Sequence, residues 1–242
     1  MSAAALAWQQ LRFERKQFWR NPSAAFFTVI LPLLFLVLIA TAFSVNDEAL
    51  RVLVPGIAGM TVMASTFNGL IHAVVFLREE GILKRVRGTP MPIASYLGGV
   101  LGSAVVNAAI ALALVLAVGN LVYGVEWPQD PFLLAAFALL GVTCFGALGV
   151  AFANAIPNSE AAPAYQNAVF LPLIFISGVF YGTDSLPRAL EVFAQALPLK
   201  PLVDGLSAAI VNGGADIAAD AAIVAAWAVA GLFLAVRFFR WE

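Results

Sequence analysis

Residues 78–90 read REEGILKRVRGTP, and this charged stretch separates two long apolar runs. Neither residues 52–77 nor residues 88–125 contain Asp, Glu, Lys or Arg. Each run is longer than the about 20 apolar residues that a helix needs to cross the hydrocarbon core of a bilayer. We call residues 78–90 the charged island. Its position predicts a loop between two membrane spans that contacts a soluble partner.

The composition of the whole chain indicates a helical membrane protein. Hydrophobic residues make up 62% of the 242 residues and charged residues 11%, whereas soluble domains carry about 25% charged residues. Charge-free windows of spanning length recur, whereas an outer-membrane barrel would show short alternating segments. The predicted fold class is therefore an all-α polytopic membrane protein. The single cysteine, Cys144, excludes an intrachain disulfide.

Six apolar segments predict six transmembrane helices, at about residues 24–43, 52–77, 93–123, 132–153, 164–181 and 218–239. With the N-terminus inside, the inner segments hold ten Lys and Arg residues and the outer segments hold three. Because cytoplasmic loops carry the excess of Lys and Arg, the N-terminus and the C-terminus are both predicted to be cytoplasmic.

Residues 1–22 predict an interfacial amphipathic helix on the inner leaflet. Their cations and aromatics are interleaved, unlike the ordered regions of a cleavable signal peptide. At about 100° per residue, Trp8 and Trp19 share the apolar face, and Arg12, Lys16 and Arg20 lie opposite. Aromatic rings at headgroup depth are typical of such a helix. The alternative is a basic flank that only sets orientation.

Residues 182–216 are too long for a tight turn and too apolar for a solvated loop. Pro187, Pro198 and Pro201 interrupt them repeatedly. Irregular backbone at membrane depth is tolerated only where protein buries it or a cavity adjoins it. We therefore predict one or two short re-entrant helices, forming an outer hairpin between the fifth and sixth spans. A helix lying on the outer surface is the alternative.

The middles of the predicted spans lack charged residues, and this separates classes of function. Proton relays and voltage sensors use ionisable groups inside the membrane, so energy is expected to enter from outside the bilayer. A stand-alone channel, or a secondary carrier with a sodium site of neutral oxygens, stays open. The chain has no phosphate-binding loop and no zinc motif. We expect no metal site, no catalytic residues and no nucleic-acid partner; a membrane enzyme ranks last.

The charged island also has an amphipathic pattern. Ile82, Leu83 and Val86 fall on one arc of a two-turn helix, which could bury them in the groove of a partner. Its basic residues would meet an acidic rim. Pro90 disfavours helix at the residue before it and so ends the segment. The alternative is a loop whose basic residues only set the membrane orientation, but such a loop would not need Ile82, Leu83 and Val86.

Residues 81–90, GILKRVRGTP, resemble the GTLKRLRATP signature of type 2 ABC exporter permeases. Residues 177–187, SGVFYGTDSLP, and 197–206, LPLKPLVDGL, resemble that family's SGVFFPLESLP and LPLTYLVDALR. The first helix ends in Arg20-Asn21-Pro22, as is typical of the family. One departure is Gly182, where the family usually has proline. The spelling is most similar to the daunorubicin and multidrug-resistance branch.

The resemblance implies one exporter transmembrane domain over residues 1–242, with an interfacial helix (1–22), a six-span bundle (24–239), a coupling loop (78–92) and an outer re-entrant segment (182–216). It implies a permease without an ATPase site and without a cofactor of its own, since ATP and magnesium bind to a separate ATPase subunit. A second permease chain, expected to be identical, would complete the exporter in the bacterial inner membrane. The family's coupling helix follows the second span, which assigns that role to Glu79, Glu80, Gly81, Ile82, Leu83, Lys84, Arg85, Val86, Arg87, Thr89 and Pro90.

The resemblance further implies a dimer contact between the first and fifth spans, enclosing a substrate path. The expected lining residues are neutral amides and aromatics: Asn68, Asn107, Phe170, Phe175, Phe180 and Tyr181. Such a lining suits a drug-like, amphiphilic or lipid-like substrate; polysaccharide or peptide export is the alternative. The amides have a second interpretation, as hydrogen bonds between helices of about 1 kcal/mol each.

Overall fold

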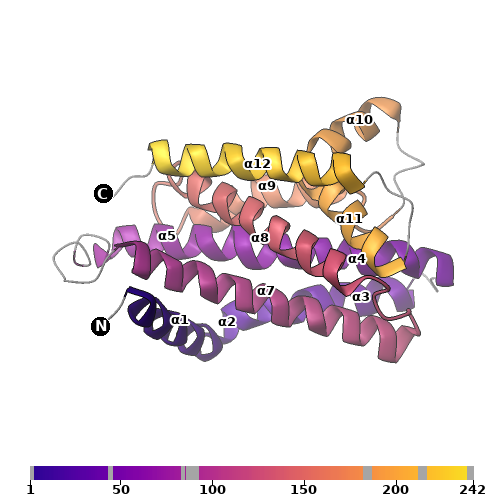
Figure 1. Cartoon of the computed structure of the whole chain (residues 1–242), viewed down its shortest axis with the longest axis horizontal. Helices are drawn as coiled ribbons and strands as arrows, with labels where there is room; N and C mark the ends of the chain where they lie inside the picture. Colours follow the sequence, from indigo (N-terminus) through magenta and orange to yellow (C-terminus); the bar gives the residue numbers. More distant parts are fainter. Residues whose placement is uncertain are drawn as a thin grey trace.

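The computed structural model describes residues 3–42, 46–82, 85, 93–181, 187–211 and 217–238, and all regular structure in these ranges is helical. The helices pack side by side along the long axis of the molecule (Figure 1). They are α1 (Ala3–Arg20), α2 (Pro22–Ala25), η1 (Phe26–Ile30), α3 (Leu31–Ala42), α4 (Asp47–Met63), η2 (Ala64–Asn68), α5 (Gly69–Glu79), α7 (Ile93–Tyr123), α8 (Pro131–Ala153), α9 (Ala162–Ile176), α10 (Arg188–Ala196), α11 (Leu199–Val211) and α12 (Ile217–Phe238).

Four of the helical stretches are long and apolar enough to cross a membrane: Asp47–Glu79, Gly98–Tyr123, Pro131–Ala153 and Ile217–Phe238. The predicted first and fifth spans correspond to shorter apolar helices, Phe26–Ala42 and Ala162–Ile176. The fifth ends early because the chain turns after Ile176, where Gly178 adopts a φ of 67°. The structure therefore gives four helices of spanning length among its described residues, and the count of six stays a prediction.

Two helices begin where a polar side chain caps them. The Asp130 carboxylate accepts hydrogen bonds from the backbone N–H groups of Phe132 and Leu133, at 3.0 and 2.9 Å, ahead of α8. Asn46 accepts one from the N–H of Ala49 at 2.9 Å, ahead of α4. Each cap supplies a partner to N–H groups that the first turn of a helix leaves free. These caps fix the start of both helices at one end of the bundle.

The continuous stretch α4–η2–α5 forms the centre of the bundle. Every residue from 53 to 67 is buried, including Thr61, Ser65 and Thr66. The hydroxyl groups of these three donate to carbonyls one turn earlier, at 2.7 Å each, so they are satisfied within their own helix. Close packing extends to the backbone, because a Cβ atom on Gly56 would lie 1.9 Å from the carbonyl oxygen of Val179.

The predicted outer segment contains two short helices in its described part. α11 buries nine of its thirteen residues and packs against α4, α8 and α12. A Cβ atom on Gly205 would lie 2.0 Å from the Phe137 ring, so α11 approaches α8 closely. α10 is mostly exposed, with Ala194 as its buried residue. Two short helices match the prediction; their depth in a bilayer stays a prediction.

Different helix ends lie at the two ends of the bundle. The end of α5, the start of α1 and the end of α12 lie together at the left of Figure 1, and α10 lies at the right. The predicted six crossings would place both chain ends on the same side as the loop after the second span. The arrangement in Figure 1 agrees with this. We call the left-hand end the island end.

Candidate functional site

The charged island begins directly at the end of α5. The N–H of Glu80 donates to the carbonyl of Phe76, and the N–H of Gly81 donates to that of Arg78, at 3.0 Å each. Gly81 has a φ of 64°, which favours glycine and ends the helix. The described part of the predicted coupling set is Glu79, Glu80, Gly81, Ile82 and Arg85. Leu83, Lys84, Val86, Arg87, Thr89 and Pro90 lie outside the described residues.

Ile82 has a contact that the sequence did not indicate. It is partly buried against the cluster formed by Leu70, Leu77, Tyr96, Val100 and Ala104, on α5 and α7. Part of its apolar surface is therefore covered by this chain itself. The predicted triad of Ile82, Leu83 and Val86 accordingly has one member that packs onto the bundle.

Arg78 and Glu79 join α5 to the turn between α8 and α9. We call residues 154–161 the inner turn. The Arg78 guanidinium donates to the carbonyl of Ala153 at 3.2 Å and to that of Ile156. The Glu79 carboxylate accepts a hydrogen bond from the N–H of Ser159 at 2.9 Å. These bonds place the inner turn, and so the start of α9, against the first residues of the charged island.

α9 has few other contacts with the rest of the chain. Only Ala162 and Ile174 are buried, and its closest described neighbours are α5 and α10. One further polar contact ties it to the centre, because the Gln166 side chain donates to the carbonyl of Asn68 at 2.9 Å. That carbonyl lies in η2, a π-helix, and such segments occur frequently at functional sites.

The two predicted path amides lie on neighbouring helices. Asn68 lies at the end of η2 and Asn107 on α7, and these elements pack against each other. The Asn107 side chain is 6% exposed. The Oδ1 atoms of both residues are buried without a hydrogen-bond partner in the described part of the chain. A buried acceptor without a donor is costly, so both oxygens are available to a donor from outside the described part of the chain.

The predicted path aromatics form a cluster at the far end of α9. Phe175 and Phe180 have ring centroids 5.9 Å apart, and the Tyr181 hydroxyl donates to the carbonyl of Phe175. Phe35 of α3 joins them, with its ring 5.7 Å from that of Phe180. Phe170 packs against the main core, as Phe35 and Phe180 also do, but it forms no ring pair with them. Three of the four predicted aromatics are therefore brought together, next to the other helix predicted for the dimer contact.

α1 has the predicted helical bounds, but its packing face differs from the predicted apolar face. Gln10 and Leu11 lie against α7, because a Cβ atom on Gly99 would come within 2.5 Å of Gln10. Trp8 and Trp19 are 60% and 47% exposed. Arg12, Lys16 and Arg20 are also exposed. The packing face is partly polar since two glycines of α7 let the α1 backbone approach closely, which the periodicity of α1 alone does not reveal.

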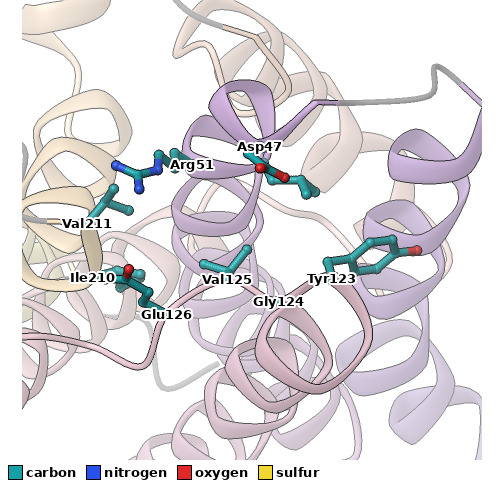
Figure 2. Close-up of a pocket in the computed structure, with 9 residues that line it drawn as sticks. Asp47, Arg51, Tyr123, Gly124, Val125, Glu126, Ile210 and Val211 are labelled. Atoms are coloured by element: carbon teal, nitrogen blue, oxygen red, sulfur yellow. The ribbon is translucent and has the colours of Figure 1, made fainter.

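A cleft of about 410 Å³ opens at the opposite end of the bundle. Its walls come from the start of α4, the end of α7 with the residues after it, and the end of α11. Figure 2 shows Arg51 reaching toward Val211, while Asp47 lies on the first turn of α4. Glu126 accepts a hydrogen bond from Gln129 at 3.3 Å. The sequence did not indicate this cleft, since its residues come from distant segments.

Sequence reasoning also missed Arg78, Ser159 and Phe35. Arg78 was assigned to the charged island only as a topology signal, and its partners are backbone carbonyls, which leave no trace in the sequence. The inner turn has no basic residue of its own. The last carbonyls of α8 have no partner within the helix, and the turn that follows has no cation to bind them. This was the available signal that a cation from another segment binds these carbonyls.

Comparison with known proteins shows which sequences this chain resembles. The sequence profile of the family described as ABC-2 type transporter matches residues 5–211. Nodulation protein J of Rhizobium meliloti (strain 1021) is 25% identical over 189 residues, which cover 76% of this chain and 70% of that protein. Nodulation protein J of Bradyrhizobium diazoefficiens is 25% identical over 191 residues, or 78% and 72%. The linearmycin resistance permease protein LnrN of Bacillus subtilis is 24% identical over 148 residues, or 61% and 38%.

Proposed function

Because this chain belongs to the ABC-2 type transporter family, we propose that it is the permease subunit of an ATP-driven exporter. Members of this family are membrane subunits of transporters, and the apolar helices of this chain fit that role. The observation that carries the proposal is the link between the charged island and the inner turn through Arg78 and Glu79. It joins the segment expected to meet an ATPase to the helix expected to border the substrate path.

The partner we propose is a separate ABC ATPase subunit, which would bind ATP and magnesium. The charged island would dock in its groove through Leu83 and the neighbouring side chains. Movement of the island would then displace the inner turn through the hydrogen bond from the Ser159 N–H to the Glu79 carboxylate, which is 2.9 Å long. α9 would follow, because it has few other contacts that hold it in place.

We propose a homodimer whose seam includes η1–α3 and α9. Large apolar side chains are exposed on both, among them Phe27, Leu38, Leu171 and Phe175. Exposed apolar surface on a membrane helix suits either lipid or another helix, so a cross-linking test is needed. In a background where Cys144 is replaced by Ala, a cysteine at Leu171 or Phe175 should cross-link between protomers. Cysteines at Gly98 and Gly102 should not, since Leu11 of α1 covers Gly102; the reverse pattern would reject this seam.

The substrate we propose is drug-like, amphiphilic or lipid-like. Support comes from the cluster of Phe35, Phe175 and Phe180 and from the unpaired amide oxygens of Asn68 and Asn107. A flat apolar body with a hydrogen-bond donor would suit both groups. One relative is by name a linearmycin resistance permease and others are nodulation proteins. Export of a polysaccharide or a peptide is the alternative.

The proposed location is the bacterial inner membrane, with both chain ends and the island end in the cytoplasm. The distribution of Lys and Arg between alternate loops supports this orientation. A labelling experiment distinguishes the two sides. A cysteine at Glu80 should react with a membrane-impermeant reagent only in inverted vesicles, and a cysteine at Gln129 only in intact spheroplasts.

The function is tested by reconstitution with a candidate ABC ATPase subunit. Vesicles containing both proteins should take up an amphiphilic fluorescent probe only with ATP and magnesium. If the purified chain alone carries the probe without ATP, it is a channel or a secondary carrier instead. Failure to co-purify with any ABC ATPase would contradict the proposed partnership.

A further inference from the structure

One face of α1 forms a shallow groove of about 330 Å³. Its six lining residues follow the spacing i, i+3, i+4, i+7, i+8 and i+11 and therefore lie on one side of the helix. The expectation that Arg12 and Lys16 lie opposite Trp8 and Trp19 was wrong, since the same groove is lined by all four. They are Trp8, Leu11, Arg12, Arg15, Lys16 and Trp19. Leu11 forms part of the groove and also packs on Gly102 of α7, so the groove is anchored to the bundle.

The groove holds three cations without an acidic partner. Among the described residues, no ion pair involves Arg12, Arg15 or Lys16. The acidic residue of α1, Glu14, does not line the groove; it accepts a hydrogen bond from Gln10 at 2.7 Å. Burial raises the pKa of Glu14, and the bond from Gln10 opposes this. Because no acidic residue lines the groove, it presents an uncompensated positive charge.

The two tryptophans bracket these cations along the helix. Trp8 lies at one end and Trp19 at the other, and both are about half exposed. Tryptophan prefers the headgroup level of a membrane, where its ring is amphipathic. Lys and Arg side chains there keep their charge among the headgroups while their stems contact apolar surface. The chain turns into its first apolar helix directly after α1, at Pro22.

We propose that this groove binds the headgroup of an anionic phospholipid of the inner leaflet. Its phosphate would lie among Arg12, Arg15 and Lys16, and its acyl chains would pass beside the Trp rings. Three cations and two indole rings match this chemistry in charge and polarity, and the groove's volume admits a headgroup rather than a whole lipid. The inference rests on the proposed orientation with the island end in the cytoplasm. It adds a defined lipid site to a helix otherwise expected only to lie on the membrane.

The test measures lipid retention by the purified full-length chain in detergent. Native mass spectrometry with phosphatidylglycerol and with phosphatidylcholine gives the preference for the anionic lipid. The double variant Arg12→Gln/Lys16→Gln should lose that preference roughly thirtyfold, since each cation near an anionic surface contributes about fivefold. Arg20→Gln is the matched control. It removes a cation from the same helix outside the groove, and it should keep most of the preference.

Several outcomes would overturn the proposal. Equal retention of both lipids by the wild-type chain would do so without any variant, and so would an equal loss in Arg20→Gln, which would indicate a diffuse positive surface. Full displacement of the lipid by inorganic phosphate at matched concentration would indicate a free-anion site. Loss of ATPase binding in the double variant, with lipid preference kept, would make the groove a protein contact. Because the readout needs no ATP or transport, it is independent of the exporter assay.

Discussion

The α4–η2 segment and α9 are both apolar, and both contain an interior proline, yet their surroundings are opposite. Every residue from 53 to 67 is buried among its neighbours, whereas α9 buries only Ala162 and Ile174. α4 packs on α7, α8 and α11, while the described contacts of α9 are few. Similar composition therefore does not specify a similar role. One segment is the fixed centre of the bundle, and the other lies at its edge.

α9 is joined to the central segment by two polar contacts, beside a narrow apolar contact of Phe170, Leu173 and Ile174 with the main core. Glu79 accepts the hydrogen bond from Ser159 in the turn before α9, and the carbonyl of Asn68 accepts the one from Gln166. The central segment is buried on every side and resists displacement in all directions, whereas α9 is held along one side only. This difference suits a helix that moves as a unit when the central segment is displaced at its end. Four substitutions test this contrast.

The largest effect is expected in the fixed centre. Gly56→Ala places a Cβ atom 1.9 Å from the Val179 carbonyl oxygen. Because that atom belongs to the backbone, it cannot rotate away, and the cost should reach or exceed about 3 kcal/mol, the upper end for overpacked cores. Gly98→Ala is the control, since nothing lies within 4 Å of a Cβ atom there. The yield of folded protein after detergent extraction and its Tm measure both. Equal Tm values for Gly56→Ala and Gly98→Ala would mean that the centre of the bundle accommodates an added methyl group as easily as an open position does.

The sequence was sufficient to predict the bounds of the helices that consist of long charge-free segments. α7 has the predicted bounds, Ile93–Tyr123, and α8 begins within one residue of the prediction because Asp130 and Pro131 mark its start. Periodicity could not distinguish a centre from an edge, since residues 52–67 and α9 both lack charged residues. Only the glycines hint at the centre, and their close contacts are with segments far away in the chain.

The candidate site was predictable in its location and less so in its contacts. The island lies at a bundle end, as expected, but Ile82 packs on Tyr96 and its neighbours, and Glu79 binds Ser159. Glu79 was predicted to contact the ATPase, and that role stays a prediction beside the observed bond. The partners of Arg78 are main-chain carbonyls, for which any residue type would serve. A sequence therefore identifies the donor in such contacts and not the acceptor.

The second expected effect concerns the end of the central segment. Leu83→Asp should bury an unpaired charge in the ATPase groove and cost several kcal/mol of association. Lys84→Ala should cost about 1 kcal/mol or less, as exposed ion pairs do. Both variants should insert and fold normally, because the island is predicted to lie outside the bilayer. A pull-down with the ATPase subunit, followed by an ATPase assay, separates them. Normal binding and transport by Leu83→Asp would reduce the island to a topology signal.

The third effect isolates the polar link between the centre and α9. Glu79→Ala removes the acceptor of the Ser159 N–H, so transport should fall several-fold while ATPase binding persists. Glu79→Gln keeps an oxygen that can accept the bond and should retain intermediate transport. Glu80→Ala is the matched control, since the Glu80 carboxylate has no partner among the described residues and only its carbonyl accepts a bond, from Arg85. If Glu80→Ala impairs transport as much as Glu79→Ala, general charge loss and not the link explains the defect.

The smallest effect concerns the second attachment of α9. Gln166→Ala deletes the 2.9 Å bond from the side chain to the carbonyl of Asn68, and hydrogen bonds between membrane helices contribute about 0.6 kcal/mol on average. Asn167→Ala is the matched control, since it removes a neighbouring carboxamide that is exposed. We expect a small drop in Tm for Gln166→Ala and none for Asn167→Ala. Because this bond is one of the few contacts between α9 and the central segment, the loss should also increase hydrogen exchange of α9 amides relative to α4 amides. An unchanged exchange pattern would mean that apolar contacts, and not this bond, hold α9 to the central segment.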